Sequence, residues 1–325
     1  MLRLTRVLPV VALLLLTLAT AADAARSGPR LSVSEATVRE AMICNGKLAG
    51  AKRDPVLLVH GTFADSEINW SWNYQKVLPE LRDQTACTVD LPDVASGDVQ
   101  VSTEYVVRAI RFMAERSDRR VAVISHSQGG LEARWALKWW PDLRRLVSDV
   151  VMLVPPNHGA VFTDNFCDEP GSCAAALYQM RSDSNFLAAL NEGRHAYGRV
   201  SLTSIVTNDD QVFVLPEQGR LGWETTRSAD VVLQDLCPDH QAQHNDLPFD
   251  GPGWFIAVDA LDHRGPARLS RIDQATACAD DTMPGVDRAY ANERLAGYSA
   301  TLAGYLGPSG PKAEGEPPLA RYARR

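Results

Sequence analysis

Short runs rich in apolar residues alternate along the chain with longer segments whose apolar residues recur at helical spacing. The strand-like runs are 55–61, 121–125, 149–155, 202–208 and 230–236. Helical spacing marks 103–117, where Ser or Thr caps the start, and also 130–140, 253–263 and 287–306. Apolar strands alternating with amphipathic helices predict an α/β fold, with a mostly parallel sheet covered by helices on both faces. No internal repeat interrupts this pattern.

The two ends of the chain differ from its middle. Residues 1–24 combine a basic start, an apolar run from Val7 to Leu18 and a small-residue end, which is the layout of a cleaved export signal. The apolar run is shorter than the roughly 20 residues of a membrane-spanning helix. We expect residues 25–306 to form one domain, because no linker divides them. Residues 307–325 are rich in Pro, Gly and charge, and alone they predict a loose tail.

Composition and charge narrow the functional class. The chain has a formal net charge of −7 at pH 7, with 45% hydrophobic and 22% charged residues. This is typical of a soluble globular protein, and the acidic balance disfavours nucleic acid or an anionic membrane as partner. Six cysteines in an exported chain without a CxxC motif favour disulfides over a zinc site, although the sequence leaves their pairing open.

Candidate chemistry begins at Ser127, in the stretch SHSQGG between the strand 121–125 and the helix from 130. A serine at a sharp strand-to-helix turn projects above the carboxyl edge of a parallel sheet, where working residues gather. The usual pattern is G-x-S-x-G, and here Ser125 replaces its first glycine. A small residue still fits so tight a turn. Ser127 is therefore the candidate nucleophile.

A serine nucleophile needs a base, and the base needs an orienting carboxylate. In this fold class, both partners follow the serine after later strands, the acid first. The stretch VTNDDQV supplies the acid, with Asp209 preferred and Asp210 as the alternative. The loop after the last strand holds His240 and His244, of which His244 lies nearer the next helix and is preferred. His263 ends the predicted helix 253–263, where a histidine interacts favourably with the helix dipole, and this structural role is sufficient for it.

An oxyanion hole must also be present, because the negative charge that develops on the substrate needs preset donors. The stretch HGTF follows the first apolar strand and offers the backbone N–H and the hydroxyl of Thr62. The amide of Gln128, directly after the nucleophile, is the second candidate donor. Each feature is ordinary alone, but all of them occur in the required order.

With these motifs placed, the sequence resembles the secreted α/β-hydrolase lipases and esterases typified by Candida antarctica lipase B. The likeness runs through VLLVHGT, STEYVVRAIRFM, VISHSQGGLEARWALKWWP and VTNDDQV, and through the segment from Cys237 to Cys278. It includes the non-glycine first position of the serine motif. The family's nucleophile, acid and histidine match Ser127, Asp209 and His244, and its oxyanion donors match Thr62 and Gln128.

The resemblance carries further structural implications. It implies the disulfides Cys44–Cys87 and Cys237–Cys278, which leaves Cys167 and Cys173 for a local bridge. It also implies that the segment 307–325 packs on the surface, although the family's extra C-terminal cysteine pair is missing here. The family's best-known member has a tryptophan where this chain has His126, so its stereochemical preference does not transfer.

The function implied is hydrolysis of carboxylic esters by a secreted lipase or carboxylesterase, through an acyl-enzyme on Ser127 and with no metal or organic cofactor. The substrate would be an ester or a lipid. Acyl transfer with the same residues is an alternative, and a non-catalytic secreted binding protein on a hydrolase scaffold is another. The sequence does not determine the acyl chain length or the oligomeric state. It also does not show whether a mobile lid is present, for which 161–189 is the natural place.

Overall fold

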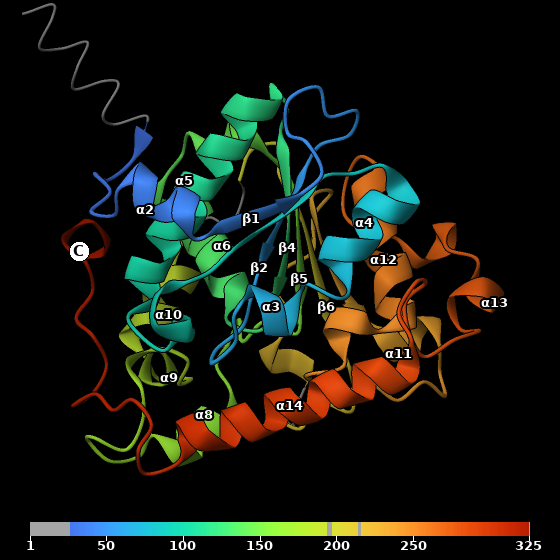
Figure 1. Ribbon diagram of the computed structural model, residues 1–325. Coiled ribbons are helices and arrows are strands. Elements are labelled where there is room, and N and C mark those ends of the chain that lie inside the picture. The colour runs from blue at the N-terminus through green and yellow to red at the C-terminus, as the bar shows by residue number, and fades with distance from the viewer. Residues whose placement is uncertain (1–26, 194–196, 214–215, 325) are drawn as a thin grey trace, which may run out of the picture.

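A seven-stranded sheet in the order β1-β3-β2-β4-β5-β6-β7 forms the centre of the computed structural model, which describes residues 27–193, 197–213 and 216–324 (Figure 1). The expected export signal lies outside these residues. The strands are β1 (Met42–Asn45), β2 (Val56–Val59), β3 (Ala86–Val89), β4 (Val121–His126), β5 (Val147–Leu153), β6 (Ser201–Val206) and β7 (Ser228–Val232). Only β1 pairs antiparallel, with β3, and all the other pairs are parallel. The predicted α/β fold is confirmed.

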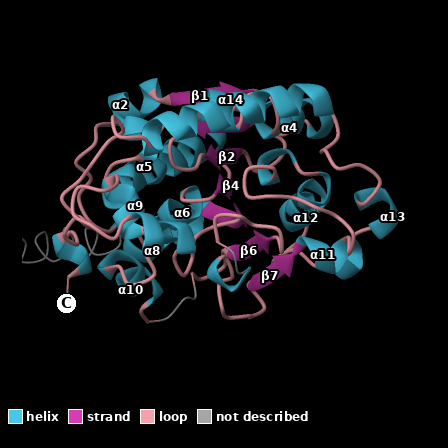
Figure 2. Ribbon diagram, turned by 90° about the horizontal axis from the view of Figure 1, so that it is seen from below, coloured by secondary structure: helices cyan, strands magenta, loops and turns pink. Residues whose placement is uncertain are grey.

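Helices cover both faces of the sheet (Figures 1 and 2). They are α2 (Glu35–Glu40), α3 (Ser66–Asn69), α4 (Tyr74–Arg82), α5 (Val99–Ser117), α6 (Gly129–Trp139), α7 (Leu143–Leu146), α8 (Val161–Phe166), α9 (Ala175–Gln179), α10 (Asn185–Asn191), α11 (Leu233–Leu236), α12 (Gly251–Asp262), α13 (Gln274–Ala277) and α14 (Arg288–Leu306). Helices α5 and α6 pack on one face, and α4 and α12 pack on the other.

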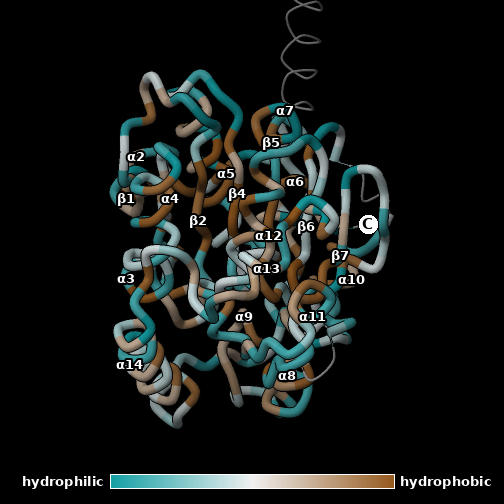
Figure 3. Tube along the Cα trace, turned by 90° about the vertical axis from the view of Figure 1, so that its right-hand side faces the viewer, coloured by the Kyte–Doolittle hydropathy of each residue, from teal (hydrophilic) through white to brown (hydrophobic). Residues whose placement is uncertain are grey.

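The central strand β4 explains why the predicted strands read as unbroken apolar runs. Val121 and Val123 join the hydrophobic core under α5 and α6, whereas Ala122 and Ile124 join the core under α4 and α12. Successive side chains of a strand point to opposite faces, and both faces are buried here. The tube in Figure 3 is accordingly apolar along β2 and along most of β4.

Two predicted elements differ from the structure by more than two residues at one end. Helix α5 begins at Val99, one turn before the expected start, because Asp98 caps it by accepting a hydrogen bond from the Gln100 N–H. The run 230–236 is a strand only as far as Val232, and its second half is the helix α11. A short apolar run does not by its periodicity distinguish a strand from a helical turn.

Three disulfides join the pairs that the resemblance implies, Cys44–Cys87, Cys167–Cys173 and Cys237–Cys278. Cys44 and Cys87 lie opposite each other on β1 and β3, so this bridge fastens the edge strand. The bridge from Cys237 to Cys278 closes the segment that contains His244. It therefore limits the freedom of the loop that carries the candidate base.

The long helix α14 lies at the carboxyl edge of the sheet (Figures 1 and 2). The hydroxyl of Tyr298 donates to the backbone oxygen of Thr62 at 2.9 Å. The ring of Tyr305 stacks on Phe63 with centroids 5.1 Å apart. Within the described ranges, no helix is both long and apolar enough to cross a membrane.

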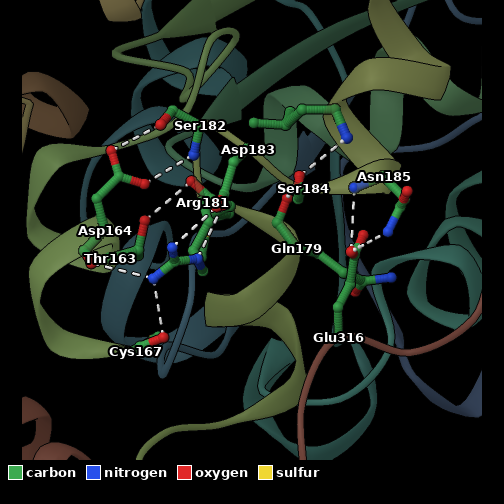
Figure 4. A network of polar contacts seen from close by, with 12 residues as sticks. Thr163, Asp164, Cys167, Gln179, Arg181, Ser182, Asp183, Ser184, Asn185 and Glu316 are labelled. Carbon is green, nitrogen blue, oxygen red and sulfur yellow. Dashed lines mark hydrogen bonds and ion pairs between the residues drawn. The ribbon is translucent and has the colours of Figure 1, made fainter. Parts of the chain in front are cut away.

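The segment after α14 is held against the surface by backbone and side-chain contacts. Ala313 exchanges backbone hydrogen bonds with the loop at Gly171 and Cys173. The Glu316 carboxylate accepts from the backbone N–H groups of Asn185 and Phe186, at 3.0 and 2.7 Å, and so caps α10 (Figure 4). This segment is packed chain as far as the structure describes it.

Candidate active site

Ser127 occupies the turn between β4 and α6 in a left-handed backbone conformation, with φ of +52°. This conformation is costly for a residue with a side chain and is typical of functional turns. The turn is possible because two glycines follow. A Cβ on Gly129 would lie 2.6 Å from the Val59 oxygen, and one on Gly130 would lie 2.7 Å from the Pro155 Cβ.

Ser125, the departure from the usual motif, causes no conflict in this turn. It lies within β4, is fully buried, and its Oγ is 3.4 Å from the oxygen of Val151 on the neighbouring strand. Its extended backbone does not require glycine. The motif therefore works with serine at its first position.

His244 lies between Ser127 and a carboxylate. Its Nε2 is 2.9 Å from Ser127 Oγ, and its Nδ1 is 2.8 Å from Asp210 Oδ2. His244 and Asp210 are 4% and 5% exposed, so water screens this pair poorly. The carboxylate fixes the proton on Nδ1 and leaves the lone pair of Nε2 directed at the serine hydroxyl.

Asp210 is held in its ionised form by its neighbours. Burial raises the pKa of this carboxyl, but the charge and the hydrogen bond of His244 together with two backbone donors outweigh burial and lower the pKa. The donors are the N–H groups of Val212 and Phe213, both of which reach Asp210 Oδ1, at 2.8 and 2.9 Å. One carboxylate oxygen is thus anchored to the backbone while the other faces the histidine.

The preference for Asp209 as the acid is wrong, because it is the alternative, Asp210, whose carboxylate contacts His244. Asp209 is exposed, and its Oδ2 accepts from the Gln234 side chain at 3.2 Å. The turn after β6 directs these consecutive side chains apart, one to the surface and one into the site. Both residues belong to the same polar turn, so the sequence alone does not distinguish them.

The alternative base, His240, contacts Asp250 and not Ser127. Its Nε2 is 2.5 Å from Asp250 Oδ2, and Asp250 is the N-cap residue of α12. The hydrogen bond and charge of this carboxylate raise the pKa of His240. His263 follows the last residue of α12, and its Nδ1 is 2.9 Å from the Asp259 oxygen. Both histidines therefore have structural partners, and neither contacts Ser127.

The candidate oxyanion donors meet beside the nucleophile. Thr62 Oγ1 donates to Gln128 Oε1 at 2.5 Å. Gln128 precedes α6, where backbone N–H groups have no partner inside the helix. Within the described chain, the N–H groups of Thr62 and Gln128 make no hydrogen bond. Tyr298, which the sequence analysis did not single out, secures the Thr62 loop through its hydroxyl.

His126, the residue before the nucleophile, has a supporting position. Its Nε2 lies 3.0 Å from the backbone oxygen of His244, and its Nδ1 lies 3.2 Å from Asn69 Oδ1. Burial, with help from the neighbouring His244, lowers the pKa of His126 to about 3. The imidazole is therefore neutral at ordinary pH and steadies the segment that carries His244.

The serine opens into a mostly apolar pocket with a cavity volume of about 120 Å³. Besides the site residues Ser127, His244, Thr62 and His126, its walls include Phe162, Leu177, Met180, Phe213, Leu302 and Leu306. These side chains come from α8, α9, α14 and the loop after β6. Such a lining suits a hydrocarbon chain that ends at the nucleophile.

A polar network fixes α8 at the wall of this pocket (Figure 4). The guanidinium of Arg181 donates to the backbone oxygens of Asp164 and Cys167, at 3.0 and 2.9 Å. The Asp164 carboxylate accepts from the N–H and hydroxyl of Ser182, at 2.8 and 2.9 Å. The hydroxyl of Thr163 donates to the Met180 oxygen. The position of Phe162 in the pocket wall thus depends on polar contacts that range from buried to exposed.

The aromatic residues Trp70, Trp72 and Tyr74 do not line the pocket at Ser127. Trp70 and Tyr74 are fully buried in the core under α4 and α12. Trp72 borders a second, smaller pocket next to His126 and Phe249. In the ranges that the structure covers, no group of three or more His, Cys, Asp or Glu side chains is arranged to bind a metal ion.

Comparisons with known proteins agree with this geometry. The chain is 26% identical over 309 residues to lipase B of Pseudozyma antarctica, covering 92% of this chain and 87% of that one. It is 31% identical over 147 residues to a triacylglycerol lipase of Pseudomonas fragi, covering 43% of this chain and 48% of that one. The crystal structure of Aspergillus fumigatus lipase B superimposes with a TM-score of 0.82 at 28% identity, covering 92% of this chain and 73% of that one. The expected resemblance to the lipase B group is confirmed.

The family model of the alpha/beta hydrolases matches residues 56–308. This range begins at β2 and ends just after α14, so it holds the whole parallel part of the sheet. It also includes the serine turn, the histidine, the buried aspartate and the oxyanion donors. With both the fold and the site inside the matched range, the chain belongs to the alpha/beta hydrolase family.

Proposed function

We propose that this protein hydrolyses carboxylic esters through an acyl-enzyme formed on Ser127. The family and the lipases named above support ester hydrolysis as the class of reaction. The serine mechanism rests chiefly on one observation. A buried histidine lies within hydrogen-bond distance of both the strained serine and a buried, ionised aspartate.

In the proposed mechanism, His244 Nε2 takes the proton of Ser127 as the hydroxyl attacks the ester carbonyl. Asp210 stabilises the imidazolium that forms and keeps the ring in place. The N–H groups of Thr62 and Gln128, and the Thr62 hydroxyl, donate to the oxyanion. The alcohol leaves with the proton from His244, and water then cleaves the acyl-enzyme by the same steps.

The pocket supports a hydrophobic acyl group as the part of the substrate that is bound. Its lining is mainly aliphatic and aromatic, and it borders Ser127 directly. Binding in such a site comes mostly from removal of apolar surface from water, about 25 cal/mol per Å². We therefore place the substrates among esters of fatty acids or similar apolar acids.

Export from the cell is also part of the proposal. Three disulfides and the similarity to lipase B support an oxidising, extracellular setting. Residues 1–24 have the pattern of a removable export signal.

Hydrolysis of p-nitrophenyl butyrate and p-nitrophenyl palmitate by the oxidised protein tests the proposal. Ser127→Ala should lose turnover to the background rate. Ser125→Ala is the matched control, because Ser125 belongs to the same motif but its hydroxyl faces the Val151 oxygen. The activity of this variant should stay within about threefold of the wild type. Full activity in Ser127→Ala would refute the serine mechanism.

A further inference from the structure

Glu132 is a fully buried carboxyl next to the oxyanion donors. It lies in the first turn of α6, four residues after Gln128, and this spacing places both side chains on one side of the helix. Its Oε1 accepts a hydrogen bond from Gln128 Nε2 at 2.8 Å. Its other oxygen, Oε2, is buried and has no hydrogen-bond partner in the described part of the chain.

Stabilisation of the helix does not explain this burial. An acidic residue in a first turn interacts favourably with the helix dipole, and it does so from an exposed position. Complete burial of a carboxyl with one unpartnered oxygen costs free energy. A costly buried polar group suggests a role in what it contacts, and here the contact is the Gln128 side chain.

The Gln128 amide connects Glu132 to Thr62. At one end its Nε2 donates to Glu132, and at the other its Oε1 accepts from the Thr62 hydroxyl. If the Gln128 amide were reversed, its NH₂ group would face the Thr62 hydroxyl. Its oxygen would then face Oε1 of Glu132, so that two acceptors would meet. With its proton on Oε2, Glu132 presents Oε1 to Gln128 as an acceptor, which leaves the amide oxygen facing Thr62.

We propose that Glu132 is a positioning residue of the oxyanion hole, which fixes the direction of the Gln128 amide and thereby the place of the Thr62 hydroxyl. The proposal rests on the proposed function, since it requires an oxyanion at this site. In the free enzyme the Thr62 hydroxyl donates to Gln128 Oε1, and this hydrogen bond fixes the position of the Thr62 oxygen. During the reaction the hydrogen turns about the C–O bond, and the oxyanion replaces Gln128 Oε1 as its acceptor.

The ionisation state of Glu132 follows from its surroundings. Burial raises the pKa of this carboxyl to about 8, against the opposing hydrogen bonds of Gln128 and of its own backbone N–H. No charged side chain is among the causes of the shift. The elements packed on α6 are α5, α7, α10, β4, β5 and the short helix η5 (Arg321–Ala323). Besides Glu132, the titratable side chains of α6 and of these elements are Glu104, Tyr105, Arg108, Arg111, Glu115, Arg116, His126, Arg134, Lys138, Arg144, Arg145, Asp149, Arg321 and Tyr322. Glu132 is thus mostly a neutral acid at pH 7.

This state has a kinetic consequence. As pH rises through about 8, Glu132 ionises and places a negative charge behind the oxyanion hole. That charge opposes the negative charge that develops on the substrate. The value of kcat should therefore fall on the alkaline side, where a histidine base alone would leave it constant.

Two substitutions separate positioning from mere support of the fold. Glu132→Gln keeps an acceptor for Gln128 but does not ionise, and Glu132→Leu removes the acceptor. We expect Glu132→Gln to stay within about threefold of the wild type at pH 7 and to lose the alkaline decline. We expect Glu132→Leu to lower kcat about tenfold or more with little change in KM. Removal of a whole oxyanion donor lowers kcat about 10²–10³-fold, and a misplaced donor should lose part of that. Each kcat is measured on p-nitrophenyl butyrate per mole of phosphonate-titrated serine.

A double-mutant cycle with Thr62→Val completes the test. If Glu132 acts through the Thr62 hydroxyl, Glu132→Leu should cost less than about twofold in the Thr62→Val background. Multiplicative losses, or wild-type kcat in Glu132→Leu, would overturn the proposal. If Glu132→Leu does not fold, an alkaline decline retained in Glu132→Gln would overturn it instead. Activity surviving in Ser127→Ala would mark failure of the proposed function itself.

Discussion

Replacement of Asp210 by Asn is expected to reduce kcat about 10³-fold or more. The carboxylate lies 2.8 Å from His244 Nδ1 in a site that is almost closed to water. With charge centres about 4 Å apart and an effective dielectric constant of about 20, the imidazolium and the carboxylate attract each other by about 4 kcal/mol. Loss of that attraction in the transition state corresponds to about 10³-fold in rate, and a wrong tautomer of the histidine adds to the loss.

Asp209→Asn is the matched control, because it makes the same chemical change one residue away at an exposed position. Its kcat on p-nitrophenyl butyrate should remain within about threefold of the wild type. Thermal unfolding of both variants would show that each is folded. A large loss in Asp209→Asn with an active Asp210→Asn would refute the assignment of the acid.

Three further outcomes follow from the structure. Replacing Cys237 and Cys278 by Ser should lower the free energy of unfolding by about 3–4 kcal/mol in the chain-entropy model, as denaturant titration would measure, and an unchanged midpoint would contradict this. Asp250 raises the pKa of His240 in the folded protein above its value of about 6.5 in the unfolded chain. The pair therefore contributes its whole stabilisation at pH values below about 6.5. That stabilisation is lost as pH rises through the pKa of His240 in the folded protein. His240→Gln should therefore destabilise the protein more at pH 5.5 than at pH 9, and an equal loss of stability at both would exclude this linkage. Thr62→Val should lower kcat about 10²-fold with KM nearly unchanged, and kinetics equal to the wild type would remove its hydroxyl from the oxyanion hole.

Much of the fold was predictable because the inner parallel strands of the sheet are buried on both faces. The strands β2, β4, β5 and β6 are buried at every position and rich in apolar residues, and the helices between them show clear periodicity. The edge of the sheet was harder to predict. β1 has mostly exposed residues, and β7 passes without a turn signal into α11. Apolar patterning therefore locates the centre of such a sheet better than its margins.

In the site, the order of residues along the chain predicted the serine, the histidine and the oxyanion donors, but not which of two adjacent aspartates faces the histidine. That choice depends on how the turn after β6 directs each side chain, which involves the backbone at Val212 and Phe213. Glu132 gave no signal in the sequence. A glutamate in the first turn of an amphipathic helix is ordinary, and only the packing around α6 shows that it is buried.

Reaction with a p-nitrophenyl alkylphosphonate tests the central claim most directly, because it traps the nucleophile without turnover. The account predicts release of one equivalent of p-nitrophenol, a single adduct on the peptide that contains Ser127, and parallel loss of esterase activity. The same reagent should leave Ser127→Ala unlabelled. An adduct on another residue with loss of activity, or full activity after complete labelling of Ser127, would contradict the account.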